Sequence, residues 1–358
     1  MASIPRSVMD AMTRHNIDLQ RYSNAEVRRI ITLLNRTDAA LMERIAAKLD
    51  NLPASATLKQ IEEVLQSVRE LNATAYERVE GGIKTAMQDL APVEAAFIGR
   101  LYTHAVPEIS FAAVSARTAR AAALARPFQG RLLSEWAKSL EENRLSRLRD
   151  VIRIGFVSGQ TVGDLVRQIR GTKAAKYADG LLEGDRRSVE RVVRAALSHT
   201  AQSTRNDWFA ANDDILGDEV WISTLDGRTS AMCQVRSGLR YTYPEHKPIG
   251  HSVPYLAGPG RLHWNCRSTS IRLLKGQKRL SGTRSSADGY VDANMTYGQW
   301  LRAQPAAVQN DILGPTRGLL FREGGLDLQG FYNDKGKLLT LAQLAARSAA
   351  AFERAGIE

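Results

Sequence analysis

The chain is poor in aromatic residues and in cysteine, and it has no long apolar run. Aromatic residues make up 6% of its 358 residues, so aliphatic packing between helices should form most of the core. It has two cysteines, too few for a disulfide framework, as is typical of a protein made in a reducing cytoplasm. No run of about eighteen apolar residues occurs, and the N-terminal stretch MASIPRSVMDAMTRHNIDLQ has no apolar h-region. We therefore expect neither a transmembrane helix nor a secretory signal.

Negative charge is scarce relative to positive charge. The 49 lysines and arginines exceed the 38 acidic residues by 11, and the isoelectric point is near 9.8. Such a balance favours anionic partners, nucleic acid first, and a solvated basic surface is the alternative. The charge is concentrated, because residues 246–287 contain eight lysines or arginines and no acidic residue. The length suggests two or three domains.

The first hundred residues have the spacing of long helices. Ser23 and Glu26 form a Ser-x-x-Glu capping box, and the apolar stripe behind it runs to Pro53. Thr57 and Gln60 begin a second stripe that runs toward Gly81-Gly82. Long helices with narrow apolar stripes pack together as a hairpin or against partner subunits, and the hairpin is the simpler interpretation.

The rest of the chain predicts shorter helices around a small sheet. We expect one helix from just after Gly130 to near Gly159, one from Thr161 to Gly171, and one over residues 185–212. Val220 and Ile222 alternate with outward positions as in a strand, and residues 238–243 and 266–274 are further strand candidates around a Pro/Gly-rich loop. A polar linker over 276–289 and short helices follow, one of them capped by Thr340 and Gln343.

These elements predict an α+β fold that is mainly helical. It has long N-terminal helices, a small mixed central domain with a two- or three-stranded sheet, and a short helical C-terminal tail. The expected regions are a helical region at 1–125, a central domain at 126–275, and a linker with tail at 276–358.

Two short stretches hold both cysteines, TLDGRTSAMC at 224–233 and LHWNCRST at 262–269. Cys233, His263 and Cys266 supply three of the four ligands that a structural zinc ion prefers, and His251, Asp226 or water could complete the set. A cysteine nucleophile is a second interpretation, with His263 as base and Asn265 as orienting group. The zinc deaminase pattern is absent, and no histidine follows His263.

The third interpretation is structural. Asp226 would make an Asx-turn, Arg228 and Thr229 would bond loop carbonyls, and Arg267 would clamp a carboxylate or carbonyl through both guanidinium nitrogens. Cys233 and Cys266 would then be small buried groups, or a disulfide formed after release from the cell. In every interpretation the two cysteines should lie close together.

The same residues carry a resemblance to a known family. The paired Asp-x-Arg-Thr…Cys and His-x-x-Cys-Arg stretches resemble the phage Mu F-like family of head morphogenesis proteins. Residues 126–171, the helix before the first strand, and the stretches 296–305 and 312–326 are also similar to that family, so the resemblance covers roughly residues 126–345. One departure is Trp264, where the family often has proline.

The resemblance implies a structural, non-enzymatic protein at the portal vertex inside the head of a tailed phage. It implies the portal protein and a major capsid or scaffold protein as partners, with the host cytoplasm as the site of assembly and the virion as the final location. Some members carry a C-terminal toxin domain, for which this tail is too short. We expect no cofactor other than a structural zinc ion. The alternative is a metal- or cysteine-dependent enzyme carried in the virion and delivered with the genome.

In that setting the basic stretch would contact packaged double-stranded DNA without sequence specificity. Arg267 is expected to be used inside the fold. The predicted phosphate contacts are the other seven basic residues of the stretch, Lys247, Arg261, Arg272, Lys275, Lys278, Arg279 and Arg284.

Overall fold

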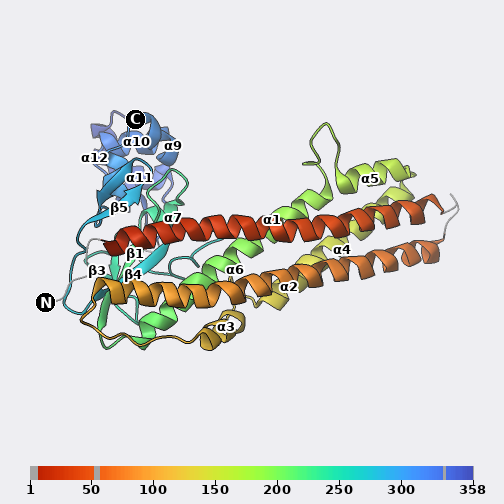
Figure 1. The fold of residues 1–358 in the computed structure, drawn as a ribbon. Helices are drawn as coiled ribbons and strands as arrows, with labels where there is room; N and C mark the ends of the chain where they lie inside the picture. The colour runs from red at the N-terminus through yellow and green to blue at the C-terminus, as the bar shows by residue number, and fades with distance from the viewer. Residues whose placement is uncertain (1–6, 52–56, 334–335, 358) are drawn as a thin grey trace. The chain divides into compact units, whose positions relative to one another are not determined.

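The computed structural model describes residues 7–51, 57–333 and 336–357, and it confirms the predicted mainly helical α+β class (Figure 1). The α-helices are α1 (Ser7–Asp50), α2 (Leu58–Ala105), α3 (Ala116–Ala125), α4 (Leu133–Val157), α5 (Val162–Arg170), α6 (Leu181–Ala211), α7 (Ala231–Gln234), α8 (Tyr297–Arg302), α9 (Ala306–Leu313), α10 (Pro315–Arg322), α11 (Leu341–Arg347) and α12 (Ala349–Arg354). The strands are β1 (Leu216–Ile222), β2 (Arg240–Tyr241), β3 (Pro248–Ile249), β4 (Thr269–Leu274), β5 (Thr283–Ser286) and β6 (Gly289–Asp292), and a 3₁₀ turn, η1, spans Gln329–Phe331. No described helix is both long and apolar enough to span a bilayer.

The chain forms two compact units, and each collects separate stretches of sequence. The hairpin unit comprises Arg21–Pro92 and Arg117–Thr200, and the sheet unit comprises Met1–Gln20, Val93–Ala116 and Ala201–Glu358. These units differ from the three consecutive regions expected at 1–125, 126–275 and 276–358. The helices α1, α2 and α6 each contribute residues to both units, and the interior of a continuous helix has no turn or linker composition that would reveal a boundary.

In the hairpin unit the two long helices pack on each other, as the simpler interpretation of their stripes predicted. Leu41 and Ile45 of α1 share a buried cluster with Ile61 and Leu65 of α2, and Leu148 of α4 joins it. Figure 1 shows α1 in red beside α2 in orange. The stripe residues of this cluster are therefore buried inside the unit.

Two of the expected helix boundaries are wrong. Ser23 lies inside α1 rather than at its start, and Glu26 pairs with Arg29 one turn further on. The Gly81-Gly82 pair does not end α2. A Cβ on Gly82 would lie 3.4 Å from the Ile30 side chain of α1, an ordinary van der Waals contact, so this glycine lies where α2 packs on α1.

Several other boundaries are confirmed. The helix α4 begins after Gly130 and ends just before Gly159, and Thr161 caps α5, which ends at Gly171. The Thr57–Gln60 pair forms the predicted reciprocal bonds before α2. Thr340 with Gln343 does the same at α11.

The main sheet of the sheet unit is antiparallel, with the order β3-β2-β1-β4. It has four strands rather than two or three, because the Pro/Gly-rich loop contributes the short edge strand β3. The expected outward positions of β1 are wrong. Val220 and Ile222 pack in one buried cluster while Trp221 packs in another, so both faces of β1 are covered.

The segment expected as a polar linker is ordered. Residues 283–292 form the β5–β6 hairpin, with Ser286 paired to Gly289 across a two-residue turn. The Ala287 N–H donates to the Leu225 carbonyl, which fixes the hairpin within the sheet unit. The short helices α8 to α12 follow at the blue end of the chain in Figure 1. They bury a second aromatic and aliphatic core that includes Trp300, Phe321 and Phe331.

Candidate metal centre and paired motif

The pairing of β1 with β4 explains why the two cysteine-containing stretches meet. In the antiparallel register Ile222 faces Thr269, so the end of β1 lies beside the start of β4. One stretch follows β1 and the other precedes β4. Although about thirty residues separate them in sequence, they therefore leave the sheet at the same end of these two adjacent strands.

Asp226 and Arg267 form the polar core of the paired motif. The two guanidinium nitrogens of Arg267 donate to the two oxygens of Asp226 over 2.8 and 2.6 Å. The Arg228 N–H donates to Asp226 Oδ1 over 3.1 Å, which is the predicted Asx-turn, and Thr229 Oγ1 donates to the Thr224 carbonyl. The Arg228 side chain is exposed, so only its backbone takes part. Burial opposes the charge of Asp226, but the Arg267 bonds outweigh it and lower the pKa of Asp226.

Cys233, His263 and Cys266 converge next to this clamp, as the sequence predicted. The two sulfurs lie 3.7 Å apart, and His263 Nε2 lies 3.2 Å from Cys233 Sγ. Both cysteines are buried free thiols, and the ligand atoms of all three residues lie within 4.8 Å of one another. The group has the composition and spacing that can hold a metal ion.

The local backbone orients His263 toward the sulfurs. Its Nδ1 lies 2.8 Å from the Trp264 carbonyl oxygen, which only accepts, so Nδ1 carries the hydrogen and Nε2 faces the thiols with its lone pair. Asn265 has φ +59°, a left-handed conformation that asparagine tolerates, and the Cys266 N–H donates to the His263 carbonyl over 3.2 Å. This turn gives Asn265 a conformational role and leaves its side chain exposed.

Hydrogen bonds among Cys233, His263 and Cys266 shift the pKa values of all three side chains. The hydrogen bond from the Cys233 thiol, together with His263, lowers the pKa of Cys266 well below that of an ordinary thiol, against the effect of burial. The same bond and burial raise the pKa of Cys233. Burial alone would lower the pKa of His263. The protonated ring, in which Nε2 also carries a hydrogen, is favoured by its hydrogen bond to Cys266 and by the charge of Cys266, and these raise the pKa. The cluster therefore stabilises one thiolate, the form in which cysteine binds a metal.

A cavity of about 240 Å³ adjoins the cluster, and Ser230, Cys233, His263 and Asn265 are among its lining residues. Ser230 Oγ lies 2.7 Å from His263 Nε2. Sequence reasoning missed this serine. Its signal was the position before the short helix α7, where a serine commonly caps.

His251 and Asp226, the two side chains proposed as a fourth zinc ligand, make other contacts. His251 Nε2 bonds to the Arg240 carbonyl over 2.9 Å and its Nδ1 accepts from the Val253 N–H. Asp226 is held by Arg267. Among the described residues, no fourth Cys, His, Asp or Glu joins the cluster.

The predicted phosphate contacts divide by burial. Lys247, Lys275, Lys278 and Arg279 are exposed, and Arg261 is half-buried. Two assignments are wrong, because Arg272 is 1% exposed and Arg284 is 0% exposed. Arg272 donates to the carbonyls of Gly217 and Leu216, and Arg284 donates to the Ser223 carbonyl. Burial lowers the pKa of Arg284 to about 10.

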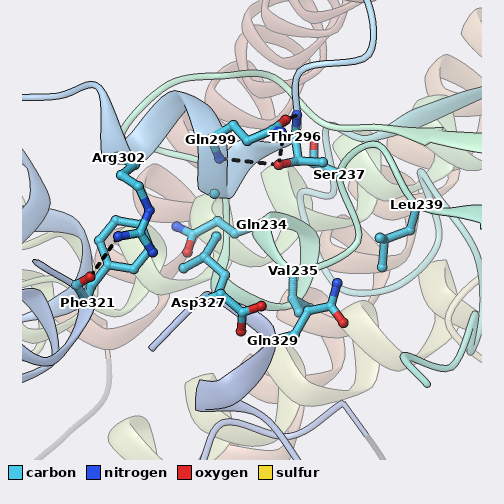
Figure 2. A pocket seen from close by; sticks show the side chains of 12 residues that line it. Gln234, Val235, Ser237, Leu239, Thr296, Gln299, Arg302, Phe321, Asp327 and Gln329 are labelled. Carbon is cyan, nitrogen blue, oxygen red and sulfur yellow. Dashed lines mark hydrogen bonds between the residues drawn. The ribbon is translucent and has the colours of Figure 1, made fainter. Parts of the chain in front are cut away.

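A second hollow, of about 200 Å³, lies between α7, α8 and the segment before η1 (Figure 2). Several of its polar side chains already make hydrogen bonds within the fold. Thr296 and Gln299 cap α8, and Arg302 donates to the Phe321 carbonyl over 3.1 Å, the two sets of dashed lines in Figure 2. The cysteine cluster is therefore the stronger candidate site.

No protein-family model, no curated protein and no solved structure matches the chain. The resemblance to the Mu F-like family therefore stays a prediction from the motif residues themselves.

Proposed function

We propose that the chain is a minor capsid protein of a tailed phage, with a structural role in head morphogenesis. The observation that carries the proposal is the contact between the two stretches that resemble the family motif, residues 224–233 and 262–269, whose polar side chains bond to each other. Asp226 and Arg267 form an ion pair with two hydrogen bonds, and the Thr229 hydroxyl donates to the Thr224 carbonyl. Polar groups arranged in this way stabilise a fold rather than present reactive atoms to a substrate.

The proposed partners follow from the family resemblance. The chain would bind the portal protein and a major capsid or scaffold protein in the host cytoplasm, and it would remain inside the virion at the portal vertex. Within this proposal the only cofactor is a structural zinc ion held by Cys233, His263 and Cys266. The chain would have no enzymatic activity.

The proposal includes non-specific contact with packaged DNA. Four of the seven predicted side chains are exposed, and they come from two segments of the sheet unit, one before β3 and one between β4 and β5. Long exposed lysine and arginine side chains reach phosphate without reading bases. The proposed DNA-contacting residues are thus Lys247, Lys275, Lys278 and Arg279, together with the half-buried Arg261.

A second candidate function is an enzyme delivered with the genome. The specific observation in its favour is the cavity beside the cysteine cluster, since a catalytic metal keeps one coordination position open. A cleavage assay on double- and single-stranded DNA with the zinc-loaded chain distinguishes the two. Turnover that disappears in His263→Gln, while binding of DNA persists, would favour the enzyme.

The portal interaction is tested by co-expressing the tagged chain with the portal protein of its own phage. Co-elution through affinity capture and size exclusion supports the proposal. Arg228→Ala, which changes an exposed side chain of the motif, serves as the folded control for Arg267→Ala, which should lose portal binding together with thermal stability. Separate elution of folded chain and assembled portal would contradict the portal assignment.

A further inference from the structure

The separations in the cysteine cluster suit a tetrahedral zinc ion. With zinc–sulfur bonds of about 2.3 Å and a zinc–nitrogen bond of about 2.0 Å, tetrahedral angles place the sulfurs about 3.8 Å apart and each sulfur about 3.5 Å from the nitrogen. The corresponding distances here are 3.7 Å between the sulfurs and 3.2 Å from Cys233 Sγ to His263 Nε2. These two separations are therefore within a few tenths of an ångström of the tetrahedral values, and all three ligand atoms lie within 4.8 Å of one another.

The surroundings also match what a bound metal requires. The Trp264 carbonyl fixes the tautomer of His263 that leaves Nε2 available, which is the usual second contact of a metal-binding histidine. Two thiolates balance the charge of one Zn²⁺, so the loaded centre is neutral. That neutrality suits cysteines that are each only 2% exposed.

The fourth coordination position has no strong protein ligand. No further Cys, His, Asp or Glu among the described residues joins the group, and the cavity of about 240 Å³ begins at its ligands. Ser230 Oγ, 2.7 Å from His263 Nε2, stands where it can hydrogen-bond an oxygen ligand that enters from the cavity.

We infer that Cys233, His263 and Cys266 hold one zinc ion whose fourth ligand is an exchangeable water, oriented by Ser230 from the adjoining cavity. The ion joins α7, which carries Cys233, to the turn before β4. It therefore links the same two stretches as the Asp226–Arg267 clamp. The inference deepens the cofactor assignment of the proposed function and rests on the geometry of the cluster. An exchangeable position does not by itself make the ion catalytic, so the inference can fail or succeed independently of the role in the phage head.

Metal content is the first measurement. The purified full chain should contain one zinc per chain by elemental analysis, and Cys233→Ser, Cys266→Ser and His263→Gln should each lose it. His251→Gln is the matched control, because His251 is a nearby histidine bound to a backbone carbonyl, and it should keep one zinc. A chain with no zinc would overturn the inference, whether mass spectrometry shows two free thiols or a Cys233–Cys266 disulfide.

The open position is tested with cobalt in place of zinc. Cobalt(II) should give tetrahedral ligand-field absorption and thiolate charge transfer, and added azide should change the spectrum by displacing the water. Ser230→Ala should retain cobalt and still respond to azide. A spectrum that azide leaves unchanged in the native chain would overturn the exchangeable ligand.

Ser230→Cys provides a gain-of-function test that does not depend on a damaged fold. A third thiolate at this position should occupy the fourth site, abolish the azide response and slow removal of the metal by a chelator about tenfold or more. Unchanged chelator kinetics and azide response in this variant would show that Ser230 does not face the metal.

Discussion

Arg267 and Asp226 are joined by two hydrogen bonds of 2.8 and 2.6 Å across 41 positions of sequence. Both side chains are about one-fifth exposed, so water screens the pair only in part. Asn16 donates to the Arg267 carbonyl, and the Tyr297 hydroxyl donates to that of Asp226. The pair thus links α1, the loop after β1, the turn before β4 and α8 within the sheet unit.

Arg267→Ala should destabilise the chain by about 2–4 kcal/mol, because it leaves the Asp226 carboxylate half-buried without its partner. Chemical denaturation followed by circular dichroism measures the loss. Arg228→Ala, in the same motif but exposed, should cost less than about 0.5 kcal/mol. Equal effects of the two substitutions would mean that the clamp does not stabilise the fold.

Asp226 should make stability dependent on acid pH. Its pKa in the folded chain lies below the unfolded value of about 3.9, so its contribution is fully present above about pH 5 and is lost as pH falls through the folded pKa. The difference in thermal midpoint between the native chain and Asp226→Asn should therefore be constant near neutrality and shrink below about pH 4. Asp150→Asn, at an exposed ion pair, should show no such pH-dependent difference.

Leu65→Asp should unfold the hairpin unit, because this side chain is 3% exposed and a buried carboxylate has no partner there. The expected cost is about 3 kcal/mol or more, seen as lost helicity at elevated temperature. Ile154→Asp places the same charge on an exposed position of α4 and should leave the midpoint nearly unchanged. Full native stability of Leu65→Asp, with only assembly lost, would restore the interpretation of a partner surface.

The contrast between Leu65 and Trp221 shows how much the sequence could predict. Helical spacing alone was enough to place Leu65 in a packed stripe, and strand and turn signals were enough to bring Cys233 beside Cys266. The alternation of side chains around Trp221 led to the wrong prediction that one face of β1 is exposed. Period-two spacing cannot reveal that other segments cover both faces of this strand. Arg284 was wrongly predicted to contact phosphate for a similar reason. Its burial depends on the β5–β6 hairpin, whose polar composition is typical of a linker. Gly82 could not be distinguished from a helix stop, because its packing against Ile30 is a tertiary contact.

The exposed basic residues should give salt-dependent DNA binding. Changing Lys275, Lys278 and Arg279 together to Ala should weaken binding to every duplex alike and reduce the logarithmic salt slope by about 0.9 for each phosphate contact removed. Changing Lys48, Lys59 and Lys84 to Ala lowers the net charge equally at exposed positions of α1 and α2, and it should leave the slope unchanged. Equal slopes for the two triple variants would assign the effect to net charge alone.

Quantitative mass spectrometry of purified phage particles tests the proposed function most directly. We expect the chain to be present in DNA-filled heads at a fixed copy number, far below that of the major capsid protein and together with the portal protein. Arg267→Ala should be depleted from those heads, and Arg228→Ala should be incorporated normally. Particles that contain portal and capsid proteins but lack this chain would contradict the assignment as a minor capsid protein.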